Sequence, residues 1–196
     1  MSEKKNIITI DGPSGAGKST ISKLLAEKLH YIYLDTGAMY RVVGLQVHRA
    51  GLDLETEEAR EKLAQLLAGL DLKLAPGEEG KETRVFLDGN DVSEAIRTPE
   101  MAMLASRVSA EPEVRRKLTD MQRSIGNNGE IVAEGRDMGT VVFPDAMHKF
   151  FLDATPEERA VRRQKQLAEQ GRHIDYNELL AQIQKRDQDD SSRALA

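Results

Sequence analysis

The sequence predicts an α/β fold with a central parallel sheet, because short apolar strands alternate with helical patterns along the chain. With 196 residues, it fits one domain, or one domain with a sizeable insertion, and can bury a substantial core. The chain has no cysteine, which excludes disulfides, thiolate metal sites and cysteine nucleophiles. These features predict a globular α/β protein that needs neither a disulfide bond nor a structural metal ion to fold.

The composition also excludes several classes of function. The formal net charge is −5, aromatic residues make up 4% and tryptophan is absent, so neither a basic nor a base-stacking surface for nucleic acid is expected. The N-terminus lacks the apolar core of a signal peptide, and no apolar run is long enough to span a membrane. We therefore expect a soluble, cytoplasmic protein, and an anionic ligand would need a local cluster of arginines.

The first elements follow from the apolar spacing. Residues 7–10 (IITI) form a buried-strand run that ends at Asp11. The next segment, 18–29, places Ile21, Leu24, Leu25 and Leu29 on one helical face. Residues 31–35 (YIYLD) predict a second strand, and a helix follows from about Ala38.

The middle of the chain predicts a small antiparallel meander inserted into the parallel core. A helix over EEAREKLAQLLAGL leads to LDLKL, whose leucines alternate as in a strand, and a loop leads to TRVFLD and the turn signal Asp88-Gly89. The segments RTPEMAMLASRV and EPEVRRKLTDMQRSI then predict two helices that return to the core.

The last third predicts two more core strands and two capped helices. The strand candidates are EIVAEGRD and HKFFLDA. Thr155, Pro156 and Glu158 combine an N-cap, a proline at the first helical position and a capping-box glutamate. Asp175 with Glu178 opens the final helix in a similar way.

A phosphate-binding loop is the strongest single motif. GPSGAGKS, residues 12–19, fits G-x-x-x-x-G-K-[ST] completely and lies between a strand and a helix. Its glycines let backbone N–H groups face a phosphate, Lys18 would reach the β- and γ-phosphates, and the Ser19 hydroxyl would ligate Mg²⁺. The alternative, a glycine-rich turn that binds nothing, is a poor match to the full pattern. The motif indicates a nucleoside triphosphate with Mg²⁺.

Two motifs that the sequence lacks limit the reactions that the γ-phosphate could undergo. No N-K-x-D element for reading guanine is present, which disfavours a switch GTPase. A motor or transporter ATPase usually shows an acidic pair at the end of a hydrophobic strand, whereas FFLDA offers Asp153 only. The remaining possibility is transfer of the γ-phosphoryl group to a bound acceptor.

Polar residues that follow two predicted strands are candidates for the acceptor side. Parallel strands present ligand sites at their carboxyl ends. The candidates are Asp35, Thr36, Tyr40 and Arg41 after the second strand, and Arg136 and Asp137 after IVAEG. An Arg136–Asp137 ion pair that only seals the sheet edge, and an Arg41 that is an ordinary surface residue, remain the alternatives.

Phosphoryl transfer calls for further arginines on an element able to close over the site, since catalysis is mostly positioning and charge stabilisation. A helical hairpin turning at Gly171-Arg172 would carry them. They are Arg159, Arg162, Arg163, Arg186 and Arg193. The competing interpretation is an ordinary solvated face of mixed charge.

Taken together, these residues resemble the bacterial cytidylate kinases. The segments GPSGAGKST, LDTGAMYR, GRDMGTVVFPDA, FLDA, ERAVRR and RDQDDSSR occur in the order and spacing of that family, over essentially the whole chain. The resemblance implies a three-layer α/β/α P-loop fold with a nucleoside-monophosphate-binding insert and a helical lid. It also implies transfer of the γ-phosphoryl group of ATP to CMP or dCMP, with Mg²⁺. We expect a monomer, and the composition predicts that it binds neither nucleic acid nor membrane.

The resemblance assigns roles residue by residue. ATP would lie against the phosphate loop, formed by Gly12, Pro13, Ser14, Gly15, Ala16, Gly17, Lys18, Ser19 and Thr20. The catalytic set would be Lys18, Arg136, Arg159, Arg163 and Arg186. CMP would be bound through its phosphate by Arg41, Arg136 and Arg186, through its base by Ser106, Arg115 and Asp137, and also by Thr36, Asp190 and Arg193. Thr36 stands where several relatives have serine.

The implied organisation is a single kinase domain over 1–196. Its core covers about 1–58 and 128–155, the insert with its return helices about 59–127, and the lid about 156–193. In the family a further parallel strand and a terminal helix follow the SSR segment, so the last core strand and its adenine contacts are expected to be missing. A P-loop kinase for another small acceptor, such as a different nucleoside monophosphate, a sugar or a shikimate-like alcohol, and a non-catalytic nucleotide-binding homologue remain the alternatives.

Overall fold

The computed structural model describes residues 6–75, 77, 83–169 and 171–191. The contacts divide the chain into two compact units, Met1–Tyr31 with Gly129–Ala196, and Ile32–Asn128. The boundaries predicted from the sequence, with an insert over about 59–127, stay a prediction.

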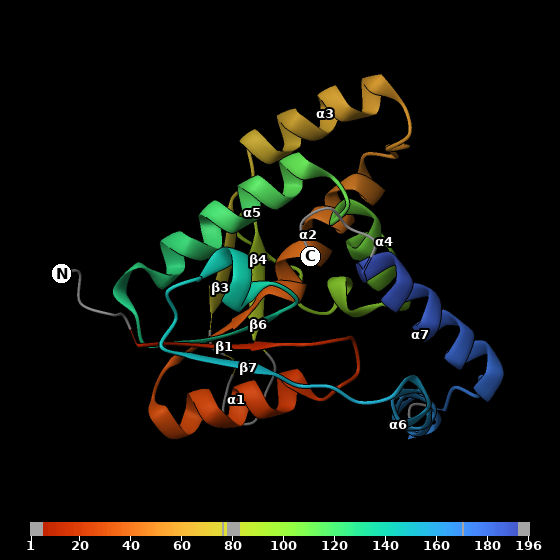
Figure 1. The fold of residues 1–196 in the computed structure, drawn as a ribbon. Coiled ribbons are helices and arrows are strands. Elements are labelled where there is room, and N and C mark those ends of the chain that lie inside the picture. The colour runs from red at the N-terminus through yellow and green to blue at the C-terminus, as the bar shows by residue number, and fades with distance from the viewer. Residues whose placement is uncertain (1–5, 76, 78–82, 170, 192–196) are drawn as a thin grey trace. The chain divides into compact units, whose positions relative to one another are not determined.

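The first unit is built on parallel strands. β1 (Ile7–Asp11) lies between β6 (Ile131–Gly135) and β7 (His148–Phe151) and pairs in parallel with both. All five residues of β1 are buried, as expected for a central strand covered on both faces. Figure 1 shows α1 (Lys18–Leu29) running beside these strands. The predicted α/β fold with a central parallel sheet is confirmed.

α1 packs through a different face from the apolar one. Its buried residues are Lys18, Ser22 and Ala26, and α1 packs against β6. Small side chains at Ser22 and Ala26 let the helix approach the sheet closely. Ile21 and Leu24 are therefore about half exposed, at 49% and 52%.

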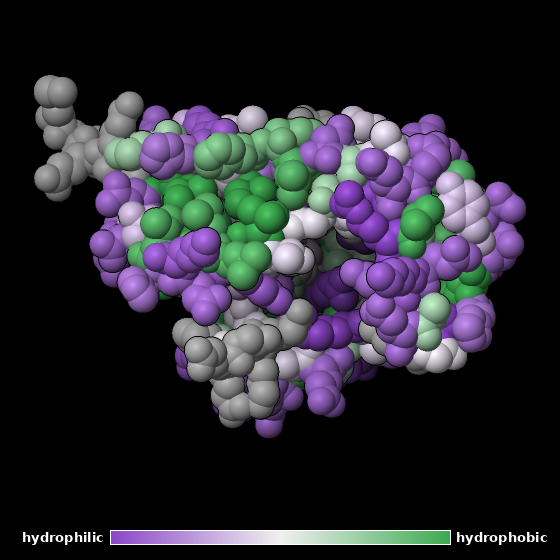
Figure 2. All heavy atoms as spheres, turned by 90° about the horizontal axis from the view of Figure 1, so that it is seen from below, coloured by the Kyte–Doolittle hydropathy of each residue, from purple (hydrophilic) through white to green (hydrophobic). Residues whose placement is uncertain are grey.

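β7 forms where the sequence predicts a strand, but it is not a buried one. All four of its residues are exposed, Phe150 at 55% and Phe151 at 70%. Figure 2 shows a hydrophobic patch on the face seen from below, the side on which α1 lies in Figure 1. The exposed large hydrophobic residues of this unit are Ile21, Leu24, Leu29, Met147, Phe150, Phe151 and Val161.

The first unit ends in a helical hairpin of α6 (Pro156–Glu169) and α7 (Tyr176–Ser191), which pack against each other. The capping box predicted for α6 is confirmed: Thr155 N donates to Glu158 Oε2 at 3.1 Å, and Glu158 N donates to Thr155 Oγ1 at 3.2 Å. Asp175 Oδ1 caps α7 by accepting from the backbone N–H groups of Asn177 and Glu178. None of the helices in the described ranges is long and apolar enough to span a membrane.

The second unit contains a small antiparallel sheet, as predicted. Its strands β3 (Leu72–Ala75), β4 (Arg84–Leu87) and β5 (Asn90–Asp91) lie in that order. Asp88 and Gly89 both have positive φ, 50° and 77°, which suits a tight turn between β4 and β5.

The remaining elements of the second unit are one strand and several helices. They are β2 (Ile32–Asp35), α2 (Thr36–Arg49), α3 (Glu57–Ala68), η1 (Ala95–Arg97), α4 (Pro99–Val108), α5 (Pro112–Ile125) and η2 (Gly126–Asn128). α2 starts two residues before the predicted position, because the Asp35 carboxylate caps it by accepting from Ala38 N at 2.9 Å. α2 and α4 pack closely, with Gly44 against Leu104.

Candidate active site

The phosphate loop connects β1 to α1. Gly12, Gly15 and Gly17 have φ of +144°, +81° and +102°, a region that side chains other than glycine rarely adopt. A Cβ on Gly12 would lie 2.0 Å from the carbonyl oxygen of Leu152, so the chain there also approaches its neighbour too closely for any side chain. Gly17 is the N-cap residue of α1 and supplies no side-chain cap. The first turn of α1 therefore presents its N–H groups without a capping side chain, as an anion-binding helix terminus does.

Lys18 is a buried lysine that lies near Arg136 and Arg186. Its side chain is buried, at 7% exposure, and Nζ donates to the Pro13 carbonyl oxygen at 2.8 Å. The pKa of Lys18 is lowered from 10.5 to about 7, mainly by burial and also by the charges of Arg136 and Arg186, while Glu134 and Asp11 act in the opposite direction. In this environment a bound anion would stabilise the charged form of Lys18, and a polyphosphate is an anion that fits the loop.

Glu134 is a site residue that the sequence reasoning missed. It is buried at the end of β6, beside Ile10 of β1, and its Oε2 accepts from Ser19 Oγ at 3.1 Å. The signal was present, because Glu134 is the acidic residue at the end of the hydrophobic strand IVAEG. The hydroxyl and the carboxylate are both hard oxygen donors of the kind that Mg²⁺ prefers, so these residues fit the ion expected with a nucleoside triphosphate. No group of three or more metal-binding side chains occurs in the parts of the chain that the structure describes.

Asp11, also missed, connects the phosphate-loop strand to the segment after β6. Its carboxylate accepts from the backbone N–H groups of Met138 and Gly139, both at 2.8 Å. These residues begin η3 (Met138–Val142), a π-helical turn that directly follows Arg136 and Asp137. Burial raises the pKa of Asp11, although the two backbone hydrogen bonds oppose this. Asp11 thus fixes the backbone that carries two predicted substrate residues.

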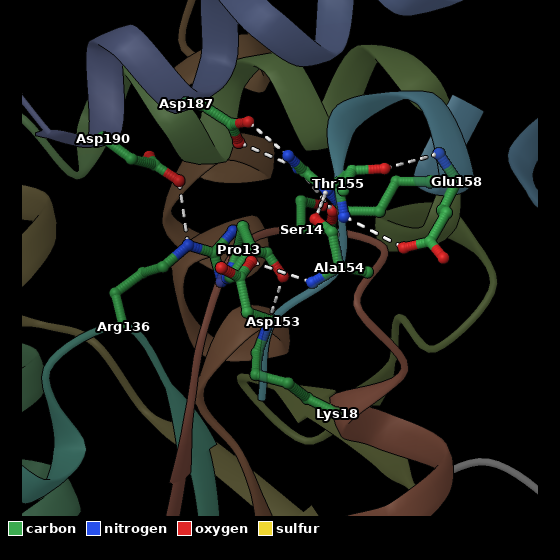
Figure 3. A network of polar contacts seen from close by, with 11 residues as sticks. Pro13, Ser14, Lys18, Arg136, Asp153, Ala154, Thr155, Glu158, Asp187 and Asp190 are labelled. Carbon is green, nitrogen blue, oxygen red and sulfur yellow. Dashed lines mark hydrogen bonds and ion pairs between the residues drawn. The ribbon is translucent and has the colours of Figure 1, made fainter. Parts of the chain in front are cut away.

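Arg136 and Asp190, two predicted substrate residues far apart in the sequence, form an ion pair. Arg136 Nε donates to Asp190 Oδ2 at 2.8 Å, and both side chains are largely buried, at 27% and 15% exposure. Figure 3 shows Asp190 reaching down from α7 to Arg136. Asp137 is buried next to Arg136 in the chain. The structure therefore brings the end of β6 and the last turns of α7 together.

Two arginines of α6 contact the phosphate loop. Arg159 is 3% exposed and donates to the Ser14 carbonyl oxygen at 3.2 Å, and Arg162 donates to the Ala16 carbonyl oxygen at 3.2 Å. Arg163, on the same helix, has an exposed side chain. Arg186 of α7 lies close enough to lower the pKa of Lys18.

The remaining predicted CMP residues that the structure describes lie in the second unit. Thr36 is the buried first residue of α2, and Arg41 of the same helix donates through Nη1 to the Ile96 carbonyl oxygen at 3.1 Å. Ser106 lies on α4 and Arg115 on α5. Arg193 lies outside the described residues. The predicted roles of all these residues stay predictions.

The comparisons with known proteins agree with the geometry. The family model described as cytidylate kinase matches residues 8–196. Among similar proteins, the cytidylate kinase of Syntrophotalea carbinolica is 50% identical over 190 residues, which cover 97% of this chain and 79% of the relative. The cytidylate kinase of Carboxydothermus hydrogenoformans is 47% identical over 96% of this chain and 83% of the relative. That of Shewanella halifaxensis is 47% identical over 100% of this chain and 84% of the relative. With a phosphate loop, a buried lysine and clustered arginines in one unit, and a match over nearly its whole length, this chain belongs to the cytidylate kinase family.

Proposed function

We propose that this chain transfers the γ-phosphoryl group of ATP to CMP or dCMP, which yields ADP and the corresponding diphosphate. The observation that carries the proposal is the cation cluster at the phosphate loop. Lys18 is buried near Arg136 and Arg186, and its pKa is lowered to about 7. Three neighbouring cations repel one another, and two phosphate-bearing substrates would offset that repulsion.

The transfer itself needs positioning more than covalent chemistry. The backbone N–H groups of the phosphate loop and Lys18 would hold the β- and γ-phosphates of ATP, and Ser19 with Glu134 would hold Mg²⁺. The ion would neutralise charge on the β- and γ-phosphates as the transition state forms. Arg136 and Arg186 would stabilise charge on the moving group, and the CMP phosphate would attack in line.

Arg136 is arranged to bind phosphate with its terminal nitrogens. Its Nε is engaged by Asp190, and an arginine held through Nε keeps its two Nη groups for a phosphate. In this arrangement Asp190 would orient Arg136 in addition to its predicted contact with CMP.

The base is the second determinant of the proposed substrate. Cytosine O2 and N3 accept hydrogen bonds, which suits Arg115 and Ser106, and its N4 amino group donates to a carboxylate such as Asp137. Uracil presents an acceptor where cytosine presents this donor, so a buried carboxylate discriminates between the two bases. Asp137 is 6% exposed, which makes an unsatisfied contact there costly.

The test is a coupled assay of ADP release with CMP, dCMP, UMP, AMP and GMP, extended to sugar and shikimate-like alcohols as acceptors. We expect CMP and dCMP to be preferred, and a chain with no such preference would contradict the proposal. Asp137→Asn should reduce the kcat/KM ratio of CMP to UMP by about tenfold or more, because an amide presents a donor as well as an acceptor. Asp145→Asn, an exposed carboxylate changed in the same way, is the matched control. An unchanged ratio in Asp137→Asn would remove this residue from the base-reading role.

A further inference from the structure

Two arginines of α6 hold the phosphate loop by its carbonyl oxygens. Arg159 Nη1 donates to Ser14 O and Arg162 Nη1 donates to Ala16 O, each at 3.2 Å. A carbonyl group and the N–H of the same peptide unit point in opposite directions, so holding the oxygens on one side directs the N–H groups to the other. The α6 arginines therefore contact the loop through groups that a nucleotide phosphate does not use.

Arg159 is itself held in place by a residue of α7. Its Nη1 donates to Asp187 Oδ1 at 2.9 Å, its Nη2 donates to Asp187 Oδ2, and its Nε donates to the Ala154 carbonyl oxygen at 2.9 Å. Figure 3 shows the paired contacts of Asp187 above Ser14 and Ala154. The two-point pairing of a planar guanidinium with a carboxylate fixes its orientation as well as its position. With 3% of Arg159 exposed, water cannot replace these contacts without rearrangement.

We propose that Asp187 is a positioning residue for the phosphate donor: it locks Arg159, and Arg159 sets the conformation of the phosphate loop at Ser14. This inference rests on the proposed use of ATP by that loop. It assigns α7 two separate tasks, because Asp190 contacts Arg136 on the acceptor side while Asp187, one turn earlier, acts on the donor side. Asp187 needs no contact with either substrate for this role.

A merely structural role of Asp187 leads to different expectations. If the ion pair only joined α6 to α7, its loss would lower the free energy of unfolding and leave the affinity for ATP unchanged. If the pair orients the phosphate loop, ATP binding weakens while the hairpin remains folded. If Arg159 instead contacts the transferring phosphate in the transition state, as the sequence predicts, changes to it would lower kcat.

The experiment compares Asp187→Asn with Asp189→Asn, an exposed aspartate two positions along the same helix that undergoes the same chemical change. We expect Asp187→Asn to raise the KM for ATP and the Kd for ATP in the absence of CMP by about tenfold, the effect of one charge-assisted hydrogen bond. The KM for CMP and kcat should change by less than about threefold, within the spread of surface substitutions. Backbone N–H groups of residues 14–17 should exchange with solvent faster than in the wild-type protein. Asp189→Asn should show none of these changes.

A double-mutant cycle separates this contact from general damage. In an Arg159→Met background, Asp187→Asn should have no further effect on ATP binding, because the pair acts through Arg159. Equal effects of Asp187→Asn and Asp189→Asn, or equal increases in the KM for ATP and CMP, would overturn the proposal. Should Asp187→Asn not fold, Arg159→Lys tests the same contact, since lysine keeps the charge but lacks the planar fork. A wild-type chain that binds ATP but phosphorylates no acceptor would refute the proposed function and leave the ATP-binding comparison valid.

Discussion

Replacement of Lys18 by methionine should stabilise the nucleotide-free protein at neutral pH while abolishing its proposed activity. Methionine retains the length of the side chain but removes a buried charge near Arg136 and Arg186. The fall of the Lys18 pKa from 10.5 to about 7 corresponds to on the order of 4 kcal/mol at pH 7. Loss of the hydrogen bond to the Pro13 carbonyl oxygen costs about 1–2 kcal/mol. A net gain of about 2–3 kcal/mol is therefore expected at pH 7.

The pH dependence distinguishes the charge from other effects of the substitution. Between pH 7 and pH 10.5 the unfolded chain still carries the Lys18 proton that the folded chain has released, so wild-type stability rises with pH through this window. The advantage of Lys18→Met should then decrease as the pH rises and disappear by about pH 10.5.

Urea unfolding without nucleotide at pH 7 and pH 10 measures this difference. Lys28→Met, which changes an exposed lysine of the same helix, is the control. A difference between Lys18→Met and the wild type that is the same at both pH values would refute the reasoning that Lys18 is a buried, strained cation. Loss of ADP release in the coupled assay checks the functional half of the prediction.

Two further substitutions test the loop and the metal site. Gly12→Ala should lower the free energy of unfolding, measured in urea, by about 3 kcal/mol or more, since the added Cβ would meet the Leu152 carbonyl oxygen at 2.0 Å. The control is Gly51→Ala, because Gly51 also has a positive φ but an added Cβ there would meet nothing within 4 Å. Gly51→Ala should lower the free energy of unfolding by only about 1 kcal/mol in the same assay. Ser19→Ala should raise the Mg²⁺ concentration needed for half-maximal activity by about tenfold, because it removes the proposed Mg²⁺ ligand, which also donates to Glu134. An unchanged Mg²⁺ titration would remove Ser19 from the proposed metal site.

The features that could be predicted from the sequence are those encoded by consecutive residues. The phosphate loop is a run of eight residues with glycines at the required positions, and the structure shows positive φ at Gly12, Gly15 and Gly17. The α6 capping box is equally local, because the side chains of Thr155 and Glu158 each accept a hydrogen bond from the backbone N–H of the other residue. The alternation of strands and helices is a short-range pattern of the same kind.

The features that could not be predicted depend on contacts between distant parts of the chain. Ser19 and Glu134 are 115 positions apart, and Asp11 and Met138 are 127 positions apart. No motif within either segment reports such a pairing. The arginines of the predicted helical hairpin were expected near phosphate, but only the fold shows that Asp187 pairs with Arg159 and Asp190 with Arg136.

Burial was the other property that local patterns misjudged. The apolar spacing of Ile21 and Leu24 correctly indicates a helix, yet both side chains are about half exposed because α1 packs through Ser22 and Ala26. HKFFLDA correctly indicates a strand, yet Phe150 and Phe151 are exposed. Periodicity specifies the type of element, whereas the neighbours that surround it decide which face is covered.

The two hydrogen bonds of Asp11 have a consequence for the entropy of catalysis. They connect the strand that leads into the phosphate loop to the turn that follows Arg136, so the groups proposed to bind the donor and the acceptor in this unit are joined through Asp11. The entropy of aligning these groups is lost once, when the protein folds, and is not lost again in each catalytic cycle. In terms of effective molarity, Asp11 would raise the local concentration of one reactant relative to the other without contacting either.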